Sequence, residues 1–467
     1  MIEMRLADVA AVTGGQLRLA TGDERITSVE FDSRATGPGA LYLTLPGARV
    51  DGHDFAGAAV AAGASAVLTA RELDLPSVVV PAAARATGTY LDDVDPDGSG
   101  AAVLAALAKL ATHVLATLPE LTLIGITGSS GKTSTKDLIG AVLAPLGPMV
   151  APPGSFNTEL GLPWTALRAD RDTRHLVLEY SARNVGHIAR LAGIARPRIS
   201  VVINVGSAHL GEFGSVGGIA LAKGELVEAL PADGVAVLNA DDPNVAAMAG
   251  RTAARKVFYG LGPDADIRAT DVVLDAGRPR FTLVTPAGSA EVALQLVGEH
   301  HVGNALAAAA VGVECGASPA GIAAALTGAA VASKWRMEVT ERADGVTVIN
   351  DAYNANPDSM RAALRALAAV GEGRRTWAVL GPMGELGVET VPAHRNIAET
   401  ARTLGAELVA VGAPHYPAER SVADVESAVA LLEAELAPGD VVLVKAGRVA
   451  QLQRIAERLL AEAPATT

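Results

Sequence analysis

The stretch at residues 128–134 constrains the fold of this chain more than any other. It reads Gly-Ser-Ser-Gly-Lys-Thr-Ser and directly follows an apolar run at residues 121–126. A strand, a glycine-rich turn and a helix in this order let backbone N–H groups surround phosphate oxygens at the positive end of the helix. Lys132 would add a positive charge, and the Thr133 hydroxyl is placed to hold Mg²⁺. We therefore predict an α/β fold with a triphosphate-binding loop made of Gly128, Ser129, Ser130, Gly131, Lys132, Thr133 and Ser134.

The loop departs from the strict pattern G-x-x-x-x-G-K-[ST] at one position. Ile126 stands where the first glycine of that pattern belongs. The generic motif alone therefore leaves open a glycine-rich turn that merely begins a structural helix.

Further motifs point to one family. Residues 127–135 resemble the shortened phosphate-binding loop of the Mur ligase family, whose members form amide bonds at the expense of ATP during peptidoglycan synthesis. The family's other motifs follow in the same order and cover nearly the whole chain: residues 156–163, 178–179, 204–210, 222–225, 239–242, 298–300, 304–305 and 351–360. The resemblance implies three α/β domains, with a central P-loop-type ATPase domain on a parallel sheet and a Rossmann-like C-terminal domain.

Two blocks near the C-terminus narrow the implied reaction. Residues 351–360 and 383–387 resemble the family member that joins D-alanyl-D-alanine to a UDP-N-acetylmuramoyl tripeptide through an acyl phosphate. A ligase that adds a single amino acid to a muramyl or folyl substrate is one alternative, and the first block argues against it. A non-catalytic ATP-dependent protein on the same fold is another, and it would be expected to lose Lys132, Glu179 or His209, which are all present.

Composition excludes several other classes of function. The net charge is -13, aromatic residues make up 3% and there is no basic stripe, so we expect no nucleic-acid partner. The N-terminus is charged where a signal peptide would be apolar, and no uncharged apolar run of 18 residues follows. We expect a cytoplasmic monomer without membrane insertion. The single cysteine, Cys315, excludes disulfides within the chain and is expected to be a buried, inert residue.

The chain length suits about three domains. We predict an N-terminal UDP-muramyl substrate-binding domain at residues 1–98, a central ATP-binding domain at 99–331 and a C-terminal domain at 332–467. The acidic run at residues 92–100 is typical of a linker. Expected parallel strands are residues 121–126, 175–179, 199–205, 235–238, 346–349, 376–380, 408–411 and 441–444, with ligands at their carboxyl ends.

Three residues beyond the loop are candidates for metal binding and catalysis with Lys132. Glu179 ends a predicted strand, and the resemblance makes it a magnesium ligand rather than an exposed strand-end carboxylate. By resemblance, His209 helps to hold a second Mg²⁺, although a loop histidine is otherwise a surface residue. Lys223 is implied to be carbamylated by CO₂, which would turn a repelled ammonium into a metal ligand. Its alternative is an ordinary solvated lysine on an amphipathic helix.

Three more residues are implied to contact the nucleotide. Asn304 resembles the adenine contact, and it also suits an N-cap at the start of a helix over residues 305–313. Arg336 resembles the arginine that reaches the phosphates across the domain gap, which suits a fixed bidentate cation. Asp351 resembles the ribose-binding aspartate, and Asn350 stands where a second aspartate is common.

The remaining implied contacts are to the substrates. They are Ser33, Arg34, Asn157, Thr158, Asn354 and Asn356. Arg34 is equally consistent with a surface ion pair. Residues 381–383 and 445–448 match the family patterns imperfectly, so the contacts to the acceptor stay open.

Overall fold

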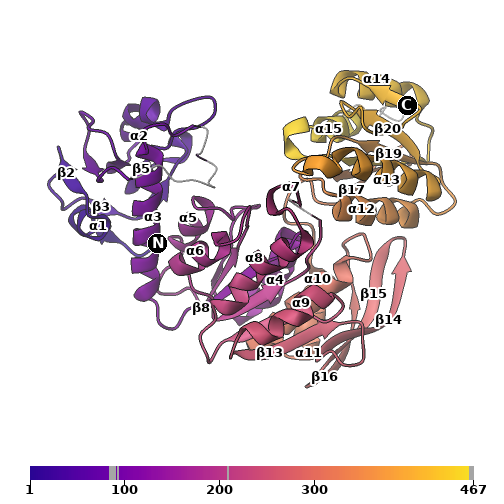
Figure 1. The fold of residues 1–467 in the computed structure, drawn as a ribbon, viewed down its shortest axis with the longest axis horizontal. Coiled ribbons are helices and arrows are strands. Elements are labelled where there is room, and N and C mark those ends of the chain that lie inside the picture. Colours follow the sequence, from indigo (N-terminus) through magenta and orange to yellow (C-terminus); the bar gives the residue numbers. More distant parts are fainter. Residues whose placement is uncertain (84–90, 92–93, 208–209, 462–467) are drawn as a thin grey trace.

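The computed structural model describes residues 1–83, 91, 94–207 and 210–461, and it shows three α/β units in chain order (Figure 1). Each unit has a sheet of its own within the described residues. Apolar runs separated by helical stretches lead to this layered architecture, because each sheet must be covered by helices to bury its faces.

The N-terminal unit is a small sheet with helices on both faces. The strand order is β2 (Gln16–Arg18), β7 (Ser77–Val79), β6 (Ala66–Thr69), β5 (Ala40–Leu43) and β4 (Ser28–Glu30), all parallel except β2. Helix α1 (Leu6–Thr13) covers one face and α2 (Ala56–Ala61) the other. Two short strands, β1 (Met4–Arg5) and β3 (Arg25–Ile26), pair beside this sheet.

Helix α3 (Ser99–Ala116) joins the N-terminal and central units. It packs against α1 on one side and against α5 (Gly161–Ala166) and α6 (His187–Ile194) on the other. By length and composition it is the one helix within the described residues that could span a membrane, with a mean hydropathy of 1.5. However, 61% of it is buried inside the molecule, and it carries Lys109, so its apolar character serves the core.

The described part of the predicted linker at residues 92–100 is not a free linker. Asp95 is 1% exposed, and its carboxylate accepts hydrogen bonds from the N–H groups of Gly100 at 2.9 Å and Ala101 at 2.8 Å. Asp97 pairs with Arg71 at 3.0 Å. The acidic composition therefore satisfies the free N–H groups and the positive dipole of α3 instead of solvating a flexible segment.

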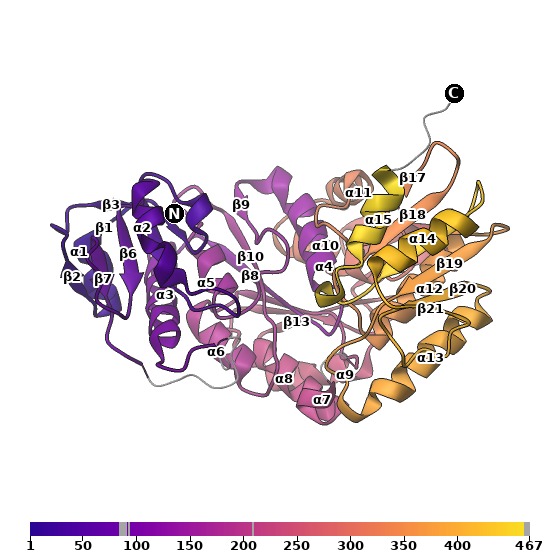
Figure 2. The ribbon, with the colours of Figure 1, turned by 90° about the horizontal axis from the view of Figure 1, so that it is seen from above.

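The central unit holds a nine-stranded sheet in the part of the chain that is described. Its order is β16 (Gly288–Ala293), β15 (Arg278–Thr285), β14 (Ile267–Asp275), β13 (Arg255–Gly260), β12 (Val235–Asn239), β11 (Ile199–Val202), β8 (Thr122–Thr127), β10 (His175–Glu179) and β9 (Met149–Val150). Helices α4 (Lys132–Leu143), α10 (His301–Glu314) and α11 (Pro319–Gly328) cover one face. On the other face lie α5, α6, α8 (Val216–Glu228) and α9 (Pro243–Ala246), and α7 (Leu210–Phe213) packs on α8 (Figure 2).

One end of this sheet differs from the purely parallel prediction. Strand β15 pairs antiparallel with both β14 and β16, and these three strands extend the parallel part of the sheet beyond β13. Their buried and more exposed residues alternate, as expected where only one face of a sheet is covered. No strand was predicted over this region, because alternation of this kind is a weaker signal than a continuous apolar run.

The C-terminal unit is a six-stranded sheet within the described residues. Its order is β17 (Glu338–Glu341), β18 (Thr347–Asp351), β22 (Val441–Lys445), β19 (Thr376–Leu380), β20 (Glu407–Val411) and β21 (Arg420–Val422), with only β17 antiparallel. Helices α12 (Pro357–Val370) and α13 (Thr390–Thr403) cover one face, and α14 (Val425–Glu435) and α15 (Gln453–Ala461) the other.

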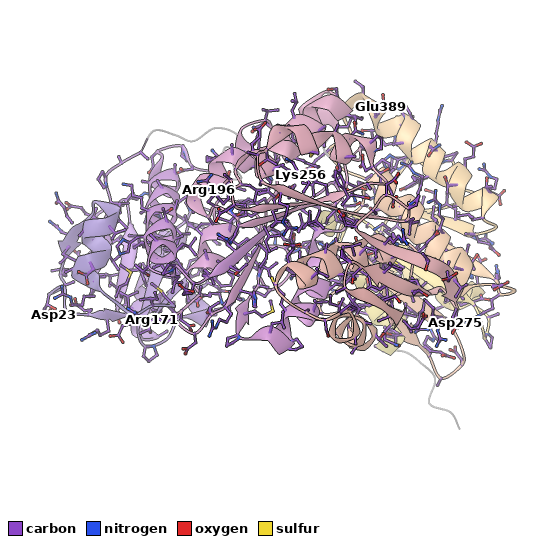
Figure 3. All side chains as sticks on the ribbon, turned by 90° about the horizontal axis from the view of Figure 1, so that it is seen from below. Asp23, Arg171, Arg196, Lys256, Asp275 and Glu389 are labelled. Carbon is purple, nitrogen blue, oxygen red and sulfur yellow. The ribbon has the colours of Figure 1, made fainter. Side chains whose placement is uncertain are left out.

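The C-terminal unit lies directly against the central one. Asp275, labelled in Figure 3, ends β14, and the hairpin that follows reaches the end of α12, where a Cβ on Gly277 would lie 2.8 Å from Val370. Glu389, labelled in the same view, ends the short helix η5 (Gly387–Glu389), which contacts α7. The central and C-terminal units therefore contact each other through this hairpin and through η5.

The predicted strands are confirmed with small shifts of their ends. The strands at residues 175–179 and 376–380 have the predicted bounds, and the strand predicted at 199–205 ends earlier, at Val202. In the central sheet the chain passes from β8 to β9 and β10 on one side and then crosses to β11 on the other side of β8. Crevices at such reversals of strand order are where open α/β sheets bind ligands.

Candidate active site

A cavity of about 390 Å³ lies between the central and C-terminal units. The central unit lines it with the loop after β8, with residues after β11, with the last residue of β12 and with the start of α10. The C-terminal unit contributes residues after β18 and the last residue of β22. Most of the predicted nucleotide contacts line it: Ser129, Ser130, Gly131, Lys132, Thr133, Ser134, Asn304, Arg336 and Asp351.

The loop after β8 has the backbone shape needed to surround phosphate. Gly131 has a φ of 81° and immediately precedes α4, and a Cβ there would lie 2.8 Å from Oδ1 of Asn304. Glycine is thus required both by the left-handed conformation and by the close approach of α10. The Lys132 ammonium donates to the Gly128 carbonyl at 2.6 Å, which holds it over the loop.

Asn204 fixes the loop from the neighbouring strand. Its side-chain oxygen accepts from the N–H groups of Ser129 at 2.9 Å and Ser130 at 3.0 Å. Asn204 begins the family motif at residues 204–210, but no role was predicted for it. Its position after β11 was visible in the sequence, whereas its contact with a loop more than 70 residues earlier depends on the pairing of β11 with β8.

Glu179 ends β10 beside this loop and is fully buried. Oε2 accepts from Ser155 Oγ and from the Asn157 side-chain amide, each at 3.2 Å. Oε1 is buried and has no hydrogen-bond partner among the described residues. The alternative of an exposed strand-end glutamate is therefore wrong, and one carboxylate oxygen is left for a further ligand.

Two lysines face the same region: Lys132 is half-buried and Lys223 is buried. Burial lowers the pKa of Lys132; the charge of Glu179 raises it and that of Arg336 lowers it further. Burial also lowers the pKa of Lys223 well below its usual value, and the nearby charge of Lys132 adds to the effect. Lys223 lies within α8, is 4% exposed, and makes no hydrogen bond or ion pair with any described residue. The alternative of a solvated surface lysine is therefore wrong.

Arg336 reaches the cavity from a strained segment between the two units. Its neighbours Trp335 and Met337 have φ values of 59° and 51°, which are left-handed conformations that cost about 1–3 kcal/mol each. The guanidinium lies over the Tyr353 ring, 4.1 Å from its centroid, and the buried Nε has no partner among the described residues. The strain and the stacking together aim this arginine at the loop after β8.

Asp351 ends β18 on the C-terminal side of the cavity. Its Oδ2 accepts from the Lys445 ammonium at 2.6 Å, and Oδ1 accepts from the Met337 N–H at 3.2 Å. Lys445 also donates to the Asn354 carbonyl at 2.9 Å. This lysine is buried at the end of β22, so the aspartate is positioned by the strand that lies beside its own in the sheet.

The start of α10 forms a further wall of the cavity. Asn304 is buried inside the helix rather than capping it, because α10 begins at His301 and so includes the three residues before it. The predicted N-cap role is therefore wrong. The rings of His300 and His301 lie against each other at a tilt of 37°, with centroids 4.2 Å apart, and burial lowers the pKa of His301 well below its usual value. Neither histidine was predicted as a site residue.

Other predicted residues lie elsewhere or have structural roles. Arg34 is 87% exposed at its side chain and pairs with Asp32 at 2.7 Å in the N-terminal unit, in the short helix η1 (Ser33–Ala35) that also contains Ser33. Neither of these two residues lines the cavity, and Thr158 does not line it either. His209 lies outside the described residues.

Two predicted substrate residues of the C-terminal unit do line the cavity. Asn354 and Asn356 both belong to its wall. Asn356 is also the N-cap of α12, because its side chain accepts from the Ser359 N–H at 2.9 Å while Ser359 Oγ accepts from the Asn356 N–H at 3.1 Å. Asn157 lines the cavity from the central unit, where it contacts Glu179.

A second cavity of about 760 Å³ adjoins the first and shares Tyr353, Asn354 and Asn356 with it. It lies at the carboxyl ends of the C-terminal strands and includes residues 447–452. Arg448 also lines this cavity, and its guanidinium lies 5.8 Å from the centroid of the Tyr353 ring. The two cavities together offer a polar pocket beside the phosphate-binding loop and a roomier pocket next to it.

Cys315 lines neither cavity. It is half-buried rather than buried as predicted, and burial raises the pKa of its thiol to about 11. The thiol therefore stays protonated near neutral pH, as expected of an inert cysteine.

The fold and the cavity define a phosphate-binding α/β protein that closes a P-loop against a Rossmann-like unit. The chain belongs to the Mur ligase family. Three descriptions of that family match it: the Mur ligase family catalytic domain at residues 25–112, the Mur ligase middle domain at 126–312 and the Mur ligase glutamate ligase domain at 335–448.

Curated relatives and solved structures resemble the chain over most of its length. The UDP-N-acetylmuramoyl-tripeptide--D-alanyl-D-alanine ligase of Mycobacterium tuberculosis H37Rv is 54% identical over 99% of this chain and 98% of its own. The Escherichia coli K12 ligase of the same name is 35% identical over 88% of this chain and 86% of its own. Crystal structure I of MurF from Acinetobacter baumannii has a TM-score of 0.84 at 28% identity, covering 98% of this chain and 99% of its own. MurF from Thermotoga maritima in complex with ADP has a TM-score of 0.78 at 28% identity, covering 93% and 97%.

Proposed function

We propose that this chain is an ATP-dependent ligase that joins D-alanyl-D-alanine to UDP-N-acetylmuramoyl tripeptide in peptidoglycan precursor synthesis. The tripeptide carboxylate would take the γ-phosphoryl group of ATP to give an acyl phosphate, and the dipeptide amine would then displace phosphate. The observation that carries the proposal is the cavity where the loop after β8 faces Asp351 and Arg336, in a chain that matches ligases of this specificity from end to end.

The residues present fit ATP and magnesium. Glu179 offers a buried carboxylate oxygen, Oε1, without a hydrogen-bond partner among the described residues. Thr133 is the second residue of α4 and follows Lys132 of the loop. Magnesium is commonly held by one or two carboxylates together with substrate phosphates. This suits the site, since no three His, Cys, Asp or Glu side chains of the described ranges gather to hold a metal. Bound Mg²⁺ would neutralise phosphate charge, and two ions, the second near His209, remain our proposal.

The roles of the other residues follow from their places. Lys132 and Arg336 would offset the charge that develops on the phosphoryl oxygens, from opposite sides of the cavity. Asp351, held by Lys445, would accept from the ribose hydroxyls, and Asn304 would contact the base. Ser33, Arg34, Asn157 and Thr158 would bind the UDP-tripeptide, while Asn354 and Asn356 border the second cavity, which we propose receives the dipeptide.

We propose domains at residues 1–98, 99–331 and 332–467, which is supported by a separate sheet in each. We also propose a monomer that works in the cytoplasm without membrane insertion and without a nucleic-acid partner. The negative charge and the largely buried α3 support these statements.

A panel of acceptors tests the proposed specificity. With ATP, Mg²⁺ and UDP-muramyl tripeptide, we expect phosphate release with D-alanyl-D-alanine and little with D-alanine, L-lysine or D-glutamate. Mass spectrometry of the product should show the tripeptide extended by two alanines. Equal turnover with free D-alanine would reject the dipeptide specificity, although it would leave an ATP-dependent ligase.

We propose further that Lys223 is carbamylated. The lowered pKa favours the uncharged amine, which is the form that adds to CO₂, and the resulting carbamate would be an anion near Lys132 and the metal site. The Lys223→Ala variant should lose most activity and regain part of it in concentrated acetate or formate. The same anions should not rescue Lys132→Ala, which needs a cation, since salt only screens charges. A fully active Lys223→Ala variant, or an unmodified Lys223 in a high-resolution map of the active magnesium-bound enzyme, would refute the carbamate.

A further inference from the structure

One carboxylate joins the central and C-terminal units without lining either cavity. Asp358 is the second residue of α12, and its Oδ2 accepts from the Ser207 backbone N–H at 2.8 Å and from Ser207 Oγ at 3.0 Å. Ser207 lies in the central unit, in the segment that follows β11. The contact therefore crosses from one unit to the other.

Asp358 is held in place from its own side. Arg361 donates to Oδ1 of Asp358 at 2.6 Å, and the same guanidinium donates to the Asn396 side chain of α13 at 3.2 Å. One carboxylate oxygen is thus used within the C-terminal unit, and the other is directed at Ser207. Hydrogen bonds to a charged acceptor of this kind are stronger than neutral ones.

The segment on the other side is tied to the phosphate-binding loop. The Gly206 N–H donates to Ser129 Oγ at 2.9 Å, one residue before the contact with Asp358. A Cβ on Gly206 would lie 2.3 Å from Oδ2 of Asp358, so the two units approach here as closely as a glycine permits. A second backbone contact, from the Gly211 N–H to the Glu385 carbonyl at 3.2 Å, lies beyond it.

We propose that Asp358 is a positioning residue that docks the C-terminal unit onto the loop after β8. Through Ser207, Gly206 and Ser129, its carboxylate sets where Asp351 stands relative to the phosphates. The inference rests on the proposed function only in assuming that the reaction needs both units together. A merely structural role within α12 would not require Ser207.

Steady-state kinetics of four single variants and one double variant test the docking role. Asp358→Ala should lower kcat about tenfold while the KM for the UDP-tripeptide stays within about twofold, because assembly of the site is impaired rather than binding to the other two units. The kcat of Asp358→Asn should lie between those of the wild type and Asp358→Ala. The amide oxygen can still accept from Ser207, whereas the amide NH₂ would face the Arg361 guanidinium. Glu399→Ala, which removes an exposed carboxylate from α13, is the matched control and should keep wild-type kcat.

The Ser207→Ala variant shows whether the two residues act as one contact. It removes one of the two donors, so its effect should be smaller, and the double variant should be no slower than Asp358→Ala alone. If the losses of kcat in the two single variants multiply in the double variant, the proposal would be overturned. A kcat for Asp358→Ala within about twofold of wild type would overturn it as well. If Asp358→Ala fails to fold, Asp358→Asn, Ser207→Ala and their double variant form the same double-mutant cycle.

Small-angle X-ray scattering separates this inference from the proposed function. With Mg²⁺ and a non-hydrolysable ATP analogue, Asp358→Ala should show a larger radius of gyration than the wild type and Glu399→Ala. Scattering that is identical to wild type would refute the docking role. A wild-type protein that ligates no acceptor would refute the proposed function and leave the scattering result to decide the docking alone.

Discussion

Lys132 and Glu179 carry the clearest expectation for single residues. Lys132→Ala and Glu179→Gln should each reduce phosphate release at least about a hundredfold, which corresponds to several kcal/mol of lost transition-state stabilisation. The physical reason is that each substitution removes a charge beside the phosphate-binding loop, and Glu179→Gln does so with almost no change in side-chain volume. Lys256→Ala, on a half-exposed position of β13 (Figure 3), serves as the control and should keep full activity. Near wild-type rates in either site variant, with circular dichroism showing an intact fold, would contradict the assignment.

His301 gives an expectation for pH. Its pKa in the folded protein is well below 6.5, so below pH 6.5 the unfolded chain binds a proton that the folded protein does not. Stability should therefore be complete above pH 6.5 and fall as the pH drops, by up to about 1.4 kcal/mol per unit from this residue. His301→Gln, which cannot be protonated there, should lose less stability than wild type between pH 7.5 and 5.5 in urea unfolding. Equal losses in the two proteins would show that His301 is not held neutral.

At the scale of elements, α3 depends on a residue that precedes it. Asp95→Ala would leave the N–H groups of Gly100 and Ala101 without their buried acceptor, at a cost of about 2–3 kcal/mol. The urea transition of the N-terminal unit, followed by circular dichroism, measures this. Asp97→Ala is the comparison, because Asp97 is half-exposed and its pair with Arg71 contributes less. A cost for Asp95→Ala no larger than that for Asp97→Ala would contradict the buried cap.

At the scale of the molecule, the arrangement of the units matters more than any one of them. The central sheet presents its loop after β8 to a cavity whose other wall is the carboxyl edge of the C-terminal sheet. Neither sheet alone encloses this cavity, so the proposed reaction depends on how the two units are held together. The strained residues around Arg336 and the contact between Asp358 and Ser207 are the places where this relation is set.

The sequence by itself determined the local structure and the chemistry of the loop. Continuous apolar runs define strands such as residues 175–179 because strand formation and burial are decided over a few neighbouring residues. The order of glycines, Lys132 and Thr133 predicts a phosphate-binding turn for the same reason. Position at a strand end was enough to place Glu179 and Asp351 at the carboxyl edges of their sheets.

Only the tertiary structure decided which distant residues meet. Asn204 supports the loop, Lys445 holds Asp351 and Asp358 reaches Ser207 because neighbouring strands and units bring them together, and no local pattern encodes such pairs. Burial is also a property of the packed molecule. The lowered pKa of Lys223 arises from packing that a helical pattern with small residues does not reveal. Asn304 illustrates the same limit, since the extra helical turn before it depends on how α10 packs against α4.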